Sequence, residues 1–364
     1  MAAKKNIGLV TWFGTPNYGT NLQAYALYKA LEERDCNVKI IRRFKEPFNL
    51  KNIKDNFFYA HGIRRFWKYG RDRFPAKTRR IRSFCRREMQ IADIYTPGDV
   101  HRLLESTDLF VAGSDQLWNC RDHFRGFEFL EFAAGKKKIS YATSIGTAEI
   151  PDEYKEKVKE YLSDFQYISL REQSGASSIA EVTGRDDIAT VLDPVLLQDR
   201  EFWESFSGSA RQMPAIPEGY VLYYILKKIP SAYSLPRDDR RKAVIIPSGE
   251  NPDFTLPGAT IVPDAGLREF VALVRGASLV VTDSFHGTAL AIALERQFIN
   301  LKRFSDSDIA SQNIRLKDLL DRLGIDDRTW QGEMPAPIDY APVRARLEIL
   351  RKESAAYLEK ALAD

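Results

Sequence analysis

The chain has 364 residues, of which 44% are hydrophobic and 29% are charged. These fractions are typical of a globular protein and exclude a collagen-like, disordered or disulfide-scaffold chain. The formal net charge of +4 is unevenly spread, because residues 61–90 sum to +9 and the other residues to −5.

The first forty residues predict a strand, a loop, a helix and a second strand. Residues 6–12 are a short apolar run bounded by turn residues, as expected of a buried parallel strand. A loop follows at 13–21, a helix at 22–35 and a strand at 37–41. Parallel neighbours need such a crossover helix.

A basic and aromatic segment at residues 44–100 interrupts this pattern with weak periodicity, and we predict an insertion there. Alternating strands and helices resume after it and continue to residue 197, which predicts a doubly wound α/β domain. The expected strands are 108–113, 139–144, 167–171 and 188–193, and the expected helices are 152–165 and 172–182.

The second half repeats the alternation after a stretch rich in Gly and Pro at 198–219, which we interpret as a linker. Strands are expected at 220–226, 242–248, 278–284 and 298–301, and helices at 266–275, 287–296 and 312–323. The predicted fold is α/β, with Rossmann-like domains at 1–197 and 198–330. The remaining segment, 331–364, is expected to form a helix that packs back on the body.

Cysteine usage and hydropathy predict a soluble cytoplasmic protein. The three cysteines have no CxxC spacing, which disfavours a disulfide framework or a zinc site and fits a reducing compartment. No stretch approaches the roughly 18 apolar residues of a spanning helix, so we expect any membrane contact to be peripheral.

Ligands of open α/β sheets bind beyond the carboxyl ends of the strands, so the loops there are the candidate sites. The first loop, FGTPNYGTNLQ, has neither a Walker A nor a GxGxxG pattern. It is polar and leads into a helix N-terminus, which favours an anion. The alternative is an ordinary βα turn. We predict substrate binding by Asn17, Tyr18, Gly19, Asn21 and Gln23.

The second loop, VAGSDQLWN, follows a buried strand with a dense set of polar residues and a tryptophan. Substrate binding is predicted for Ser114, Asp115, Gln116 and Trp118. The alternative is that Ser114 or Asp115 only caps the next helix.

The third region combines SYATSIGT, which contains the candidate Ser144, with ISLREQSG. Arg171 ends a buried strand there. A charged residue in such a place meets either a protein carboxylate or an anionic ligand, and the sequence leaves both open.

The fourth region, residues 278–297, is an apolar strand, a polar loop and a strongly apolar helix. His286 stands in the first turn of this helix, where a nearby anion would favour its protonated form, so it suits a general acid. The alternative is a core or capping histidine. Asp283, Ser284 and Gly287 are further substrate-binding candidates.

The fifth region places Asn313 and Arg315 at the start of a helix. Arg315 is predicted to bind an anion, with a surface ion pair to Asp318 or Asp321 as the alternative. The sequence has no HExxH or GxSxG motif and no metal-ligand cluster. The residues therefore describe an enzyme that handles a small, multiply anionic substrate without metal.

Seven motifs, in order along the chain, resemble those of the polysaccharide pyruvyl transferases. The resemblance implies a fold like that of the GT-B glycosyltransferases and transfer of the pyruvyl group of phosphoenolpyruvate to sugar hydroxyls, usually as a cyclic ketal. It implies a role in making cell-surface (capsular or extracellular) polysaccharide, a sugar or lipid-linked oligosaccharide acceptor, and no cofactor. The motifs are NYGTNLQAYAL, GSDQLWN, SYATSIGT, SLREQSG, VLDPVLL, TDSFHGTALAIAL and QNIRLKDLL.

The resemblance places the family's acid on His286 and its arginine on Arg171. Many members carry a second arginine two residues before the histidine, where this SFHG branch has Ser284. We expect Arg315 to supply that charge, so that the two arginines hold carboxylate and phosphate. Asp115 and Asp283 are candidates for the base that accepts the hydroxyl proton.

Two other functions remain open from the sequence. One is a sugar-nucleotide glycosyltransferase of the same architecture. The other is a non-enzymatic protein whose basic and aromatic residues 61–90 bind nucleic acid or an anionic membrane. We assign this segment to acceptor or peripheral membrane docking at the inner face of the membrane, and we expect no nucleic acid. A solvated insertion without such a role is the simpler alternative.

Overall fold

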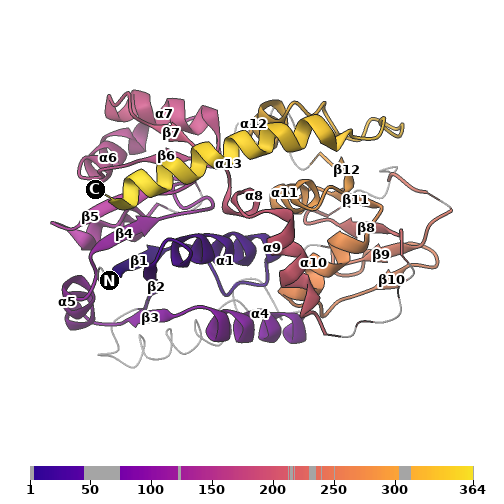
Figure 1. The fold of residues 1–364 in the computed structure, drawn as a ribbon, viewed down its shortest axis with the longest axis horizontal. Helices are drawn as coiled ribbons and strands as arrows, with labels where there is room; N and C mark the ends of the chain where they lie inside the picture. The colour runs from indigo at the N-terminus through magenta and orange to yellow at the C-terminus, as the bar shows by residue number, and fades with distance from the viewer. Residues whose placement is uncertain are drawn as a thin grey trace.

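The computed structural model describes residues 4–44, 74–121, 124–211, 213, 216, 218–228, 235–238, 240–249, 251–302 and 313–363. Within these residues the chain forms two five-stranded parallel sheets, each accompanied by helices (Figure 1). This is the α/β architecture with two sheets that the alternating pattern predicts.

The first sheet has the order β3-β2-β1-β4-β5, and each pair of neighbours is parallel. Its central strand has the four residues at its carboxyl end buried, as the apolar run predicts. The strands are β1 Lys5–Val10, β2 Cys36–Arg43, β3 Ile91–Ile94, β4 Leu109–Ala112 and β5 Lys137–Ser140.

Helix α1, Tyr18–Glu32, begins four residues earlier than the sequence predicts. Asn17 is its N-cap, and its side chain accepts a hydrogen bond from the backbone of Thr20. All of the first eleven helical residues are buried, on more than one face, so the amphipathic period that marks a helix is lost at this end. Much of the predicted loop is therefore the first turn of a helix.

The expectation of an unpatterned segment at 44–100 is wrong for residues 75–100, which contain α4 Pro75–Glu88, β3 and the start of α5 Pro97–Glu105. Helix α4 buries a narrow stripe that includes Ile81 and Phe84. Its many arginines leave little apolar signal for the sequence to show. Residues 45–73, the rest of the predicted insertion, lie outside the described residues.

Two short strands extend the first half beyond β5. The expected strands at 167–171 and 188–193 are β6 Ser169–Leu170 and β7 Ala189–Thr190, a parallel pair. Single bridges join Ile139 to Tyr167 and Thr143 to Leu170, so the carboxyl ends of β5 and β6 lie next to each other. The accompanying helices are α6 Asp152–Leu162 and α7 Gln173–Thr183.

The second sheet has the order β10-β9-β8-β11-β12 and is also parallel. The sequence predicts four of its strands and misses β10, which has only two residues. The strands are β8 Val221–Tyr224, β9 Ala243–Ile245, β10 Thr260–Ile261, β11 Leu279–Thr282 and β12 Gln297–Asn300. The helices are α10 Leu267–Gly276, α11 Phe285–Ala293 and α12 Asn313–Leu323.

The first part of the predicted linker 198–219 is helical, because it contains α9 Arg200–Gly208. Helix α8, Pro194–Leu197, lies directly before it. Trp203 of α9 is fully buried, and its indole N–H donates to the carbonyl of Val195. A single apolar cluster runs from the first sheet through these helices to the second. The domain boundaries stay a prediction.

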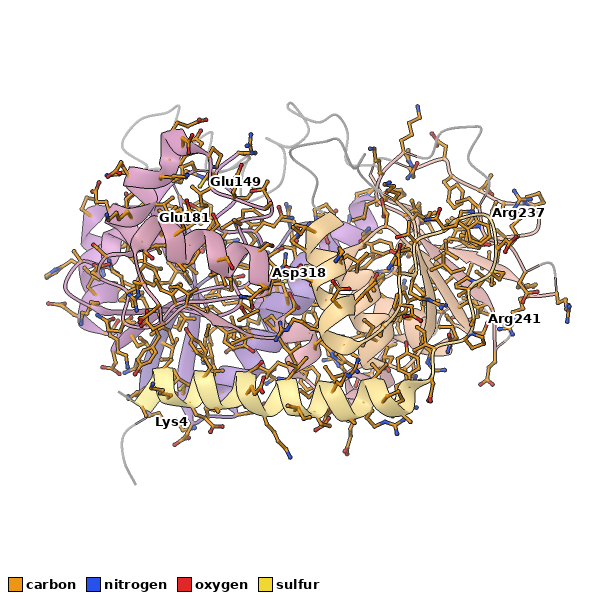
Figure 2. The ribbon with its side chains drawn as sticks, turned by 90° about the horizontal axis from the view of Figure 1, so that it is seen from above. Lys4, Glu149, Glu181, Arg237, Arg241 and Asp318 are labelled. Atoms are coloured by element: carbon orange, nitrogen blue, oxygen red, sulfur yellow. The ribbon has the colours of Figure 1, made fainter. Side chains whose placement is uncertain are left out.

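Helix α13, Tyr340–Ala363, runs along both halves of the molecule (Figures 1 and 2). It buries Leu347 and Leu358 among other apolar side chains. Ser354 accepts a hydrogen bond from the backbone of Leu192 at 2.9 Å, and Tyr357 donates to the carbonyl of Ser140 at 2.8 Å. The C-terminal helix is thus anchored near the ends of β5 and β7.

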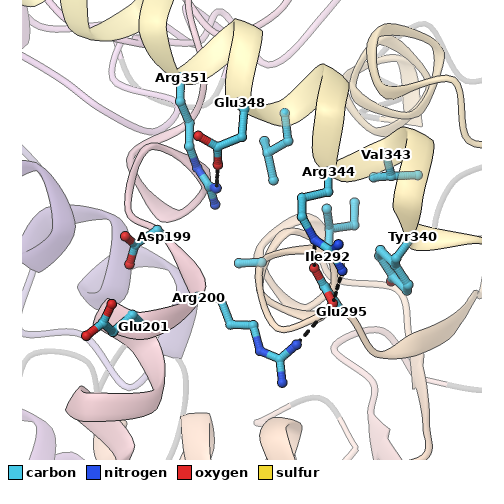
Figure 3. Close-up of a pocket in the computed structure, with 12 residues that line it drawn as sticks. Asp199, Arg200, Glu201, Ile292, Glu295, Tyr340, Val343, Arg344, Glu348 and Arg351 are labelled. Atoms are coloured by element: carbon cyan, nitrogen blue, oxygen red, sulfur yellow. Dashed lines mark hydrogen bonds and ion pairs between the residues drawn. The ribbon is translucent and has the colours of Figure 1, made fainter.

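A cavity of about 300 Å³ lies between α9, α11 and α13 (Figure 3). Glu295, just after α11, accepts two hydrogen bonds from Arg344 of α13, at 2.7 and 2.9 Å, and one from Arg200 of α9 at 3.0 Å. These partly exposed ion pairs join the three helices at the end of α11 that is distant from its first turn.

The anchoring of α13 predicts that Leu358→Ala lowers the free energy of unfolding by about 3 kcal/mol, because it leaves a cavity in a fully buried place. Ile349→Ala on the same helix is the control, since this side chain is 57% exposed. We expect it to change stability by less than about 0.5 kcal/mol. Urea unfolding measures both, and equal losses would contradict the described packing of α13.

Candidate active site

The carboxyl ends of β4, β6 and β7 meet the start of α11 around Arg171, whose side chain is 1% exposed. Its guanidinium donates to Asp193 Oδ2 at 2.8 Å and to Asp115 Oδ1 at 3.2 Å. Its Nε lies 3.7 Å from Glu172 Oε2. Arg171 therefore meets protein carboxylates, one of the two alternatives that the sequence leaves open. Binding of an anionic ligand by this residue stays a prediction.

Asp193 is a site residue that sequence reasoning missed. It follows β7 and caps α8, where Oδ1 accepts a hydrogen bond from the backbone of Val195 at 2.9 Å. Its other oxygen, Oδ2, faces both Arg171 and His286. The available signal was the Asp-Pro pair at the end of an apolar run in VLDPVLL, which places a carboxylate at the carboxyl edge of the sheet.

His286 lies in the first turn of α11, as predicted, and Ser284 caps this helix by accepting from the backbone of Gly287. The ring atom Nε2 lies 3.4 Å from Asp193 Oδ2 and 3.3 Å from a guanidinium nitrogen of Arg171. A protonated Nε2 donates to Asp193, whereas a deprotonated Nε2 accepts from Arg171. One end of the imidazole is therefore held by partners from the first half of the chain.

The other end of the ring packs against Gly19 in the first turn of α1. A Cβ atom at residue 19 would lie 2.4 Å from Nδ1 of His286, far inside van der Waals contact. Only glycine allows this approach. The first turns of α1 and α11, one from each half of the chain, therefore meet at the imidazole.

Phe285 brings the second predicted arginine to the same place. The guanidinium carbon of Arg171 lies 4.4 Å from the Phe285 ring centroid, and that of Arg315 lies 5.8 Å from it. Arg315 is buried. Its predicted surface partners have other contacts, because Asp318 accepts from Ser174 and Asp321 pairs with Lys317.

The carboxyl groups around Arg171 differ in their affinity for protons. Burial by itself raises the pKa of Asp193 and Asp115, but His286 and Arg171 outweigh it and hold both pKa values below the usual range. Burial dominates for Glu172, and its pKa is raised. Burial opposes the charge of Arg171, yet its pKa is raised because Asp115 and Asp193 surround it. The site thus stabilises an ionised core of Asp115, Asp193 and Arg171.

Three polar candidates of the first loop shape the backbone around this core. Asn17 caps α1, and Asn21 accepts from the backbone of Gly14 at 2.7 Å. Gln23 donates to Thr11 at 3.0 Å and accepts from the backbone of Ser114 at 3.3 Å, which joins the ends of β1 and β4. Their predicted contact with substrate stays a prediction.

Two aromatic candidates lie in the core and are not at a surface that a ligand reaches. Tyr18 is fully buried, donates to the carbonyl of Ala265 and stacks on Phe270. Trp118 is fully buried as well, and its indole donates to the carbonyl of Glu128. The sequence predicts both as ligand contacts from their position in polar loops, whereas in the structure both pack between elements.

Ser114 and Ser144 are buried beside the core and bond to backbone. Ser114 donates to the carbonyl of Ala142 at 2.7 Å, and Ser144 accepts from the backbone of Gly146 at 3.1 Å. Gln116 is half-buried and accepts from Asn119. These residues order the loops after β4 and β5.

Asp283 points to the second sheet and not to Arg171. Its carboxylate accepts from the backbone of Leu226 at 2.6 Å and of Lys227 at 2.8 Å, which ties the end of β8 to β11. Gly287 packs closely on Thr282, where a Cβ would lie 2.8 Å from the hydroxyl. The side chain of Asn313 lies outside the described residues.

The basic segment 61–90 is described only from residue 74. In that part Lys77 lies over the Tyr18 ring at 4.1 Å, and Arg80 pairs with Asp264 of the second half at 2.7 Å. Arg80 therefore joins the two halves. Residues 61–73, and the predicted docking role with them, lie outside the described residues.

Within the described ranges, no group of three or more His, Cys, Asp or Glu side chains is placed to hold a metal ion. None of the described helices combines the length and the apolar character needed to cross a membrane. The three cysteines are free and buried.

A family model described as polysaccharide pyruvyl transferase matches residues 17–303 of the chain. This range includes the surroundings of Arg171 and His286. Comparison with curated proteins gives no match.

Solved structures of similar fold cover nearly the whole chain. HepE from Anabaena, in complex with UDP and glucose, has a TM-score of 0.50 and 9% identity, and the match covers 99% of this chain and 94% of that one. A putative UDP-N-acetylglucosamine 2-epimerase from Listeria monocytogenes has a TM-score of 0.49 and 10% identity, with 99% and 91% covered. At such identity the likeness concerns the fold alone, which is that of the GT-B glycosyltransferases, as expected from the sequence.

The buried ion pairs predict that Asp193→Asn lowers the free energy of unfolding by about 3 kcal/mol near neutral pH, because Arg171 keeps its charge and loses a partner. Since the folded-state pKa of Asp193 lies below its unfolded value of about 3.9, its contribution is present above that pH and is lost as the pH falls further. Urea unfolding at neutral pH and at about pH 3 should therefore show a smaller acid loss in the variant. An unchanged acid loss would contradict this role.

The approach of α1 to α11 predicts that Gly19→Ala displaces the imidazole of His286, because the added methyl occupies the place beside Nδ1. The measurement is the shift of the His286 ring signals in a histidine-selective NMR spectrum. Gly208→Ala is the control, since a Cβ there meets no atom within 4 Å. Unmoved His286 signals in the Gly19 variant would refute the contact.

Proposed function

The chain belongs to the polysaccharide pyruvyl transferase family, and from this we propose that it transfers the pyruvyl group of phosphoenolpyruvate to hydroxyls of a sugar acceptor. Family and fold together indicate a transferase that acts on polysaccharides. That conclusion is at odds with a purely nucleic-acid- or membrane-binding role. The donor and the ketal product are the part that we propose.

The orientation of His286 is the observation that carries the proposal. Its Nε2 faces Asp193 and Arg171, so Nδ1, beside Gly19, is the nitrogen that we assign to proton transfer. A carboxylate that fixes the ring and balances its charge is the arrangement in which histidine serves as a general acid. Arg171 acts as a positioning residue in this proposal, because its two terminal nitrogens donate to Asp193 and Asp115.

In the first step, Nδ1 of His286 gives its proton to the methylene carbon of phosphoenolpyruvate, which becomes a methyl group. The neighbouring carbon, C2, then carries positive charge that its phosphate-bearing oxygen shares. A sugar hydroxyl attacks C2, and its proton passes to the imidazole that has just lost one.

In the second step, the bond between C2 and the phosphate oxygen breaks and phosphate leaves. A second hydroxyl of the acceptor attacks C2 and closes the cyclic ketal. Of the two hydroxyl protons, one replaces the proton delivered to the methyl group and the other ends on phosphate. Carbon is neither oxidised nor reduced overall, so no redox cofactor takes part.

The imidazole is a better choice of base than the two carboxylates suggested by the sequence. Asp115 accepts from Arg171 and from the hydroxyl of Thr20, and Asp283 is bound by two backbone N–H groups. Either one would have to give up these bonds to accept a proton. His286 needs no such change.

Anion binding is assigned to Arg315 and to the first turn of α11. Arg315 is the buried cation near Phe285 that stands in for the arginine replaced by Ser284. Ser284 instead caps α11 and aligns its first turn, where backbone N–H groups favour phosphate.

The acceptor is a sugar or a lipid-linked oligosaccharide in this proposal, and the enzyme works in the cytoplasm at the inner face of the membrane. The polysaccharide family supports such an acceptor. The free, buried cysteines are consistent with a reducing compartment.

The test is phosphate release from phosphoenolpyruvate with a panel of nitrophenyl hexosides that present two neighbouring free hydroxyls. We expect turnover by the native enzyme and a loss of about a hundredfold or more in His286→Gln. Thermal shift should show stabilisation by phosphoenolpyruvate and none by UDP- or GDP-sugars.

The control is His101→Gln, because this histidine is exposed on α5 and far in sequence from the site. Turnover by His286→Gln close to the native rate would rule out the acid role. Stabilisation by a sugar nucleotide in place of phosphoenolpyruvate would instead establish the glycosyltransferase alternative.

A further inference from the structure

A second cavity, of about 370 Å³, opens at the amino ends of β8 and β9. The His286 site lies at the carboxyl ends of the strands, so the two are on opposite edges of the second sheet. Figure 2 shows Arg237 and Arg241 at the outer end of this half, away from Asp318 of α12. The volume is within the range of sites that bind small molecules.

The rim of this cavity is basic, with Arg237, Arg240, Arg241 and Lys242. All four residues are exposed. Of these four residues, only Arg241 has an ion pair with a described residue, which is Asp238 at 2.9 Å. Asp238 also accepts a hydrogen bond from the backbone of Arg240. Within the part of the chain that the structure describes, the other three rim cations therefore have no carboxylate partner, although the chain outside residues 61–90 is acidic on balance.

The remaining lining is largely apolar. Its apolar members are Val221, Ala243, Leu256 and Pro257. Tyr223 also lines the cavity, and its hydroxyl donates a hydrogen bond to the carbonyl of Pro236. A ligand that fits has an apolar face for this lining and an anionic group for the rim. A sugar ring with a carboxylate has both, since one face of such a ring exposes mainly C–H groups and guanidinium binds carboxylate in two-point contact.

We propose that this cavity binds a carboxylate-bearing sugar unit of the polysaccharide on which the enzyme acts. The carboxylate can come from a uronic acid of the chain or from a pyruvate ketal. The ketal source rests on the proposed function, because transfer of the pyruvyl group leaves its carboxylate on every modified sugar. In that case the enzyme holds the chain through units that it has already modified.

A membrane surface fits the same rim less well. The basic side chains surround a concavity, which a lipid surface cannot enter. A large exposed hydrophobic residue of this region is Ile261 on the edge strand β10, with 44% exposure. A membrane-binding surface would depend on such an apolar side chain as well as on the charges.

The experiment measures binding by titration calorimetry without phosphoenolpyruvate. The probes are a methyl galactoside carrying a 4,6-linked pyruvate ketal, a galacturonic acid trimer and a neutral galactose trimer. We expect either acidic probe to bind, and the neutral trimer to bind at least tenfold more weakly. The triple variant Arg237→Ala, Arg240→Ala, Lys242→Ala should lose about tenfold in affinity for the acidic probe.

The charge-matched control replaces the exposed residues Lys39, Lys159 and Lys352 by alanine and should bind as the native protein does. Binding of the ketal alone supports product retention, and binding of the uronate alone supports recognition of an acidic acceptor. Failure of both acidic probes to bind, or equal binding by the triple variant, would overturn the proposal.

Vesicles of phosphatidylglycerol and phosphatidylcholine provide the membrane arm. If the native protein floats with them and both the triple variant and Ile261→Ser fail to, while the sugars do not bind, the surface is a membrane contact and the sugar proposal is wrong. Phosphate release by the triple variant on a nitrophenyl hexoside should equal that of the native enzyme. If no protein tested, the native enzyme included, releases phosphate, the proposed function is refuted and the binding result is unaffected.

Discussion

The positive charge of Arg171 is buried almost completely, and the surrounding structure is arranged to balance it. An unpaired charge in such a place is strongly destabilising, so the three carboxyl groups at its edges are a condition of the fold before they are a catalytic device. They come from the ends of three different strands, and these strand ends meet at one point. Arg171 also orients His286, because one of its guanidinium nitrogens and Oδ2 of Asp193 both lie next to Nε2 of the imidazole.

Glycine and polar caps allow the second half to reach this point. Gly19 leaves the space that the imidazole occupies, and Ser284 fixes the first turn of α11. The apolar helix behind His286 is buried along its whole length in the cluster shared by both halves. The proposed acid therefore has its orientation without a bound substrate. The capped first turn of α11 positions the imidazole, and the buried carboxylate of Asp193 fixes its Nε2 end.

The sequence predicts the architecture well because alternation of apolar strands with helices is a local property. It also predicts that His286 stands in the first turn of a helix and Arg171 at the end of a strand, since both follow apolar runs. It misses Asp193 as a site residue and wrongly assigns Tyr18 and Trp118 to substrate binding. A polar or aromatic residue at a strand end has the same sequence pattern whether it faces a ligand, an ion pair or the core. Which of these holds depends on the partner that another element brings, such as Ala265 for Tyr18. The sequence also misses helix α4, because its basic residues contact other elements, as Arg80 contacts Asp264 of the second half and Lys77 contacts Tyr18 of α1, and such contacts have no local signature.

The contact between Gly19 and His286 also limits how the family's genes can recombine. The proposed acid is encoded in one half of the chain, and its space, its counter-ion and its guanidinium partner are encoded in the other. A chimera that joins the first half of one homologue to the second half of another therefore inherits an intact imidazole but not necessarily a place for it. A crossover between the halves preserves the site when the parents have the same residues at positions 19, 171 and 193. Identity at these three positions is therefore a criterion for choosing parents in domain shuffling.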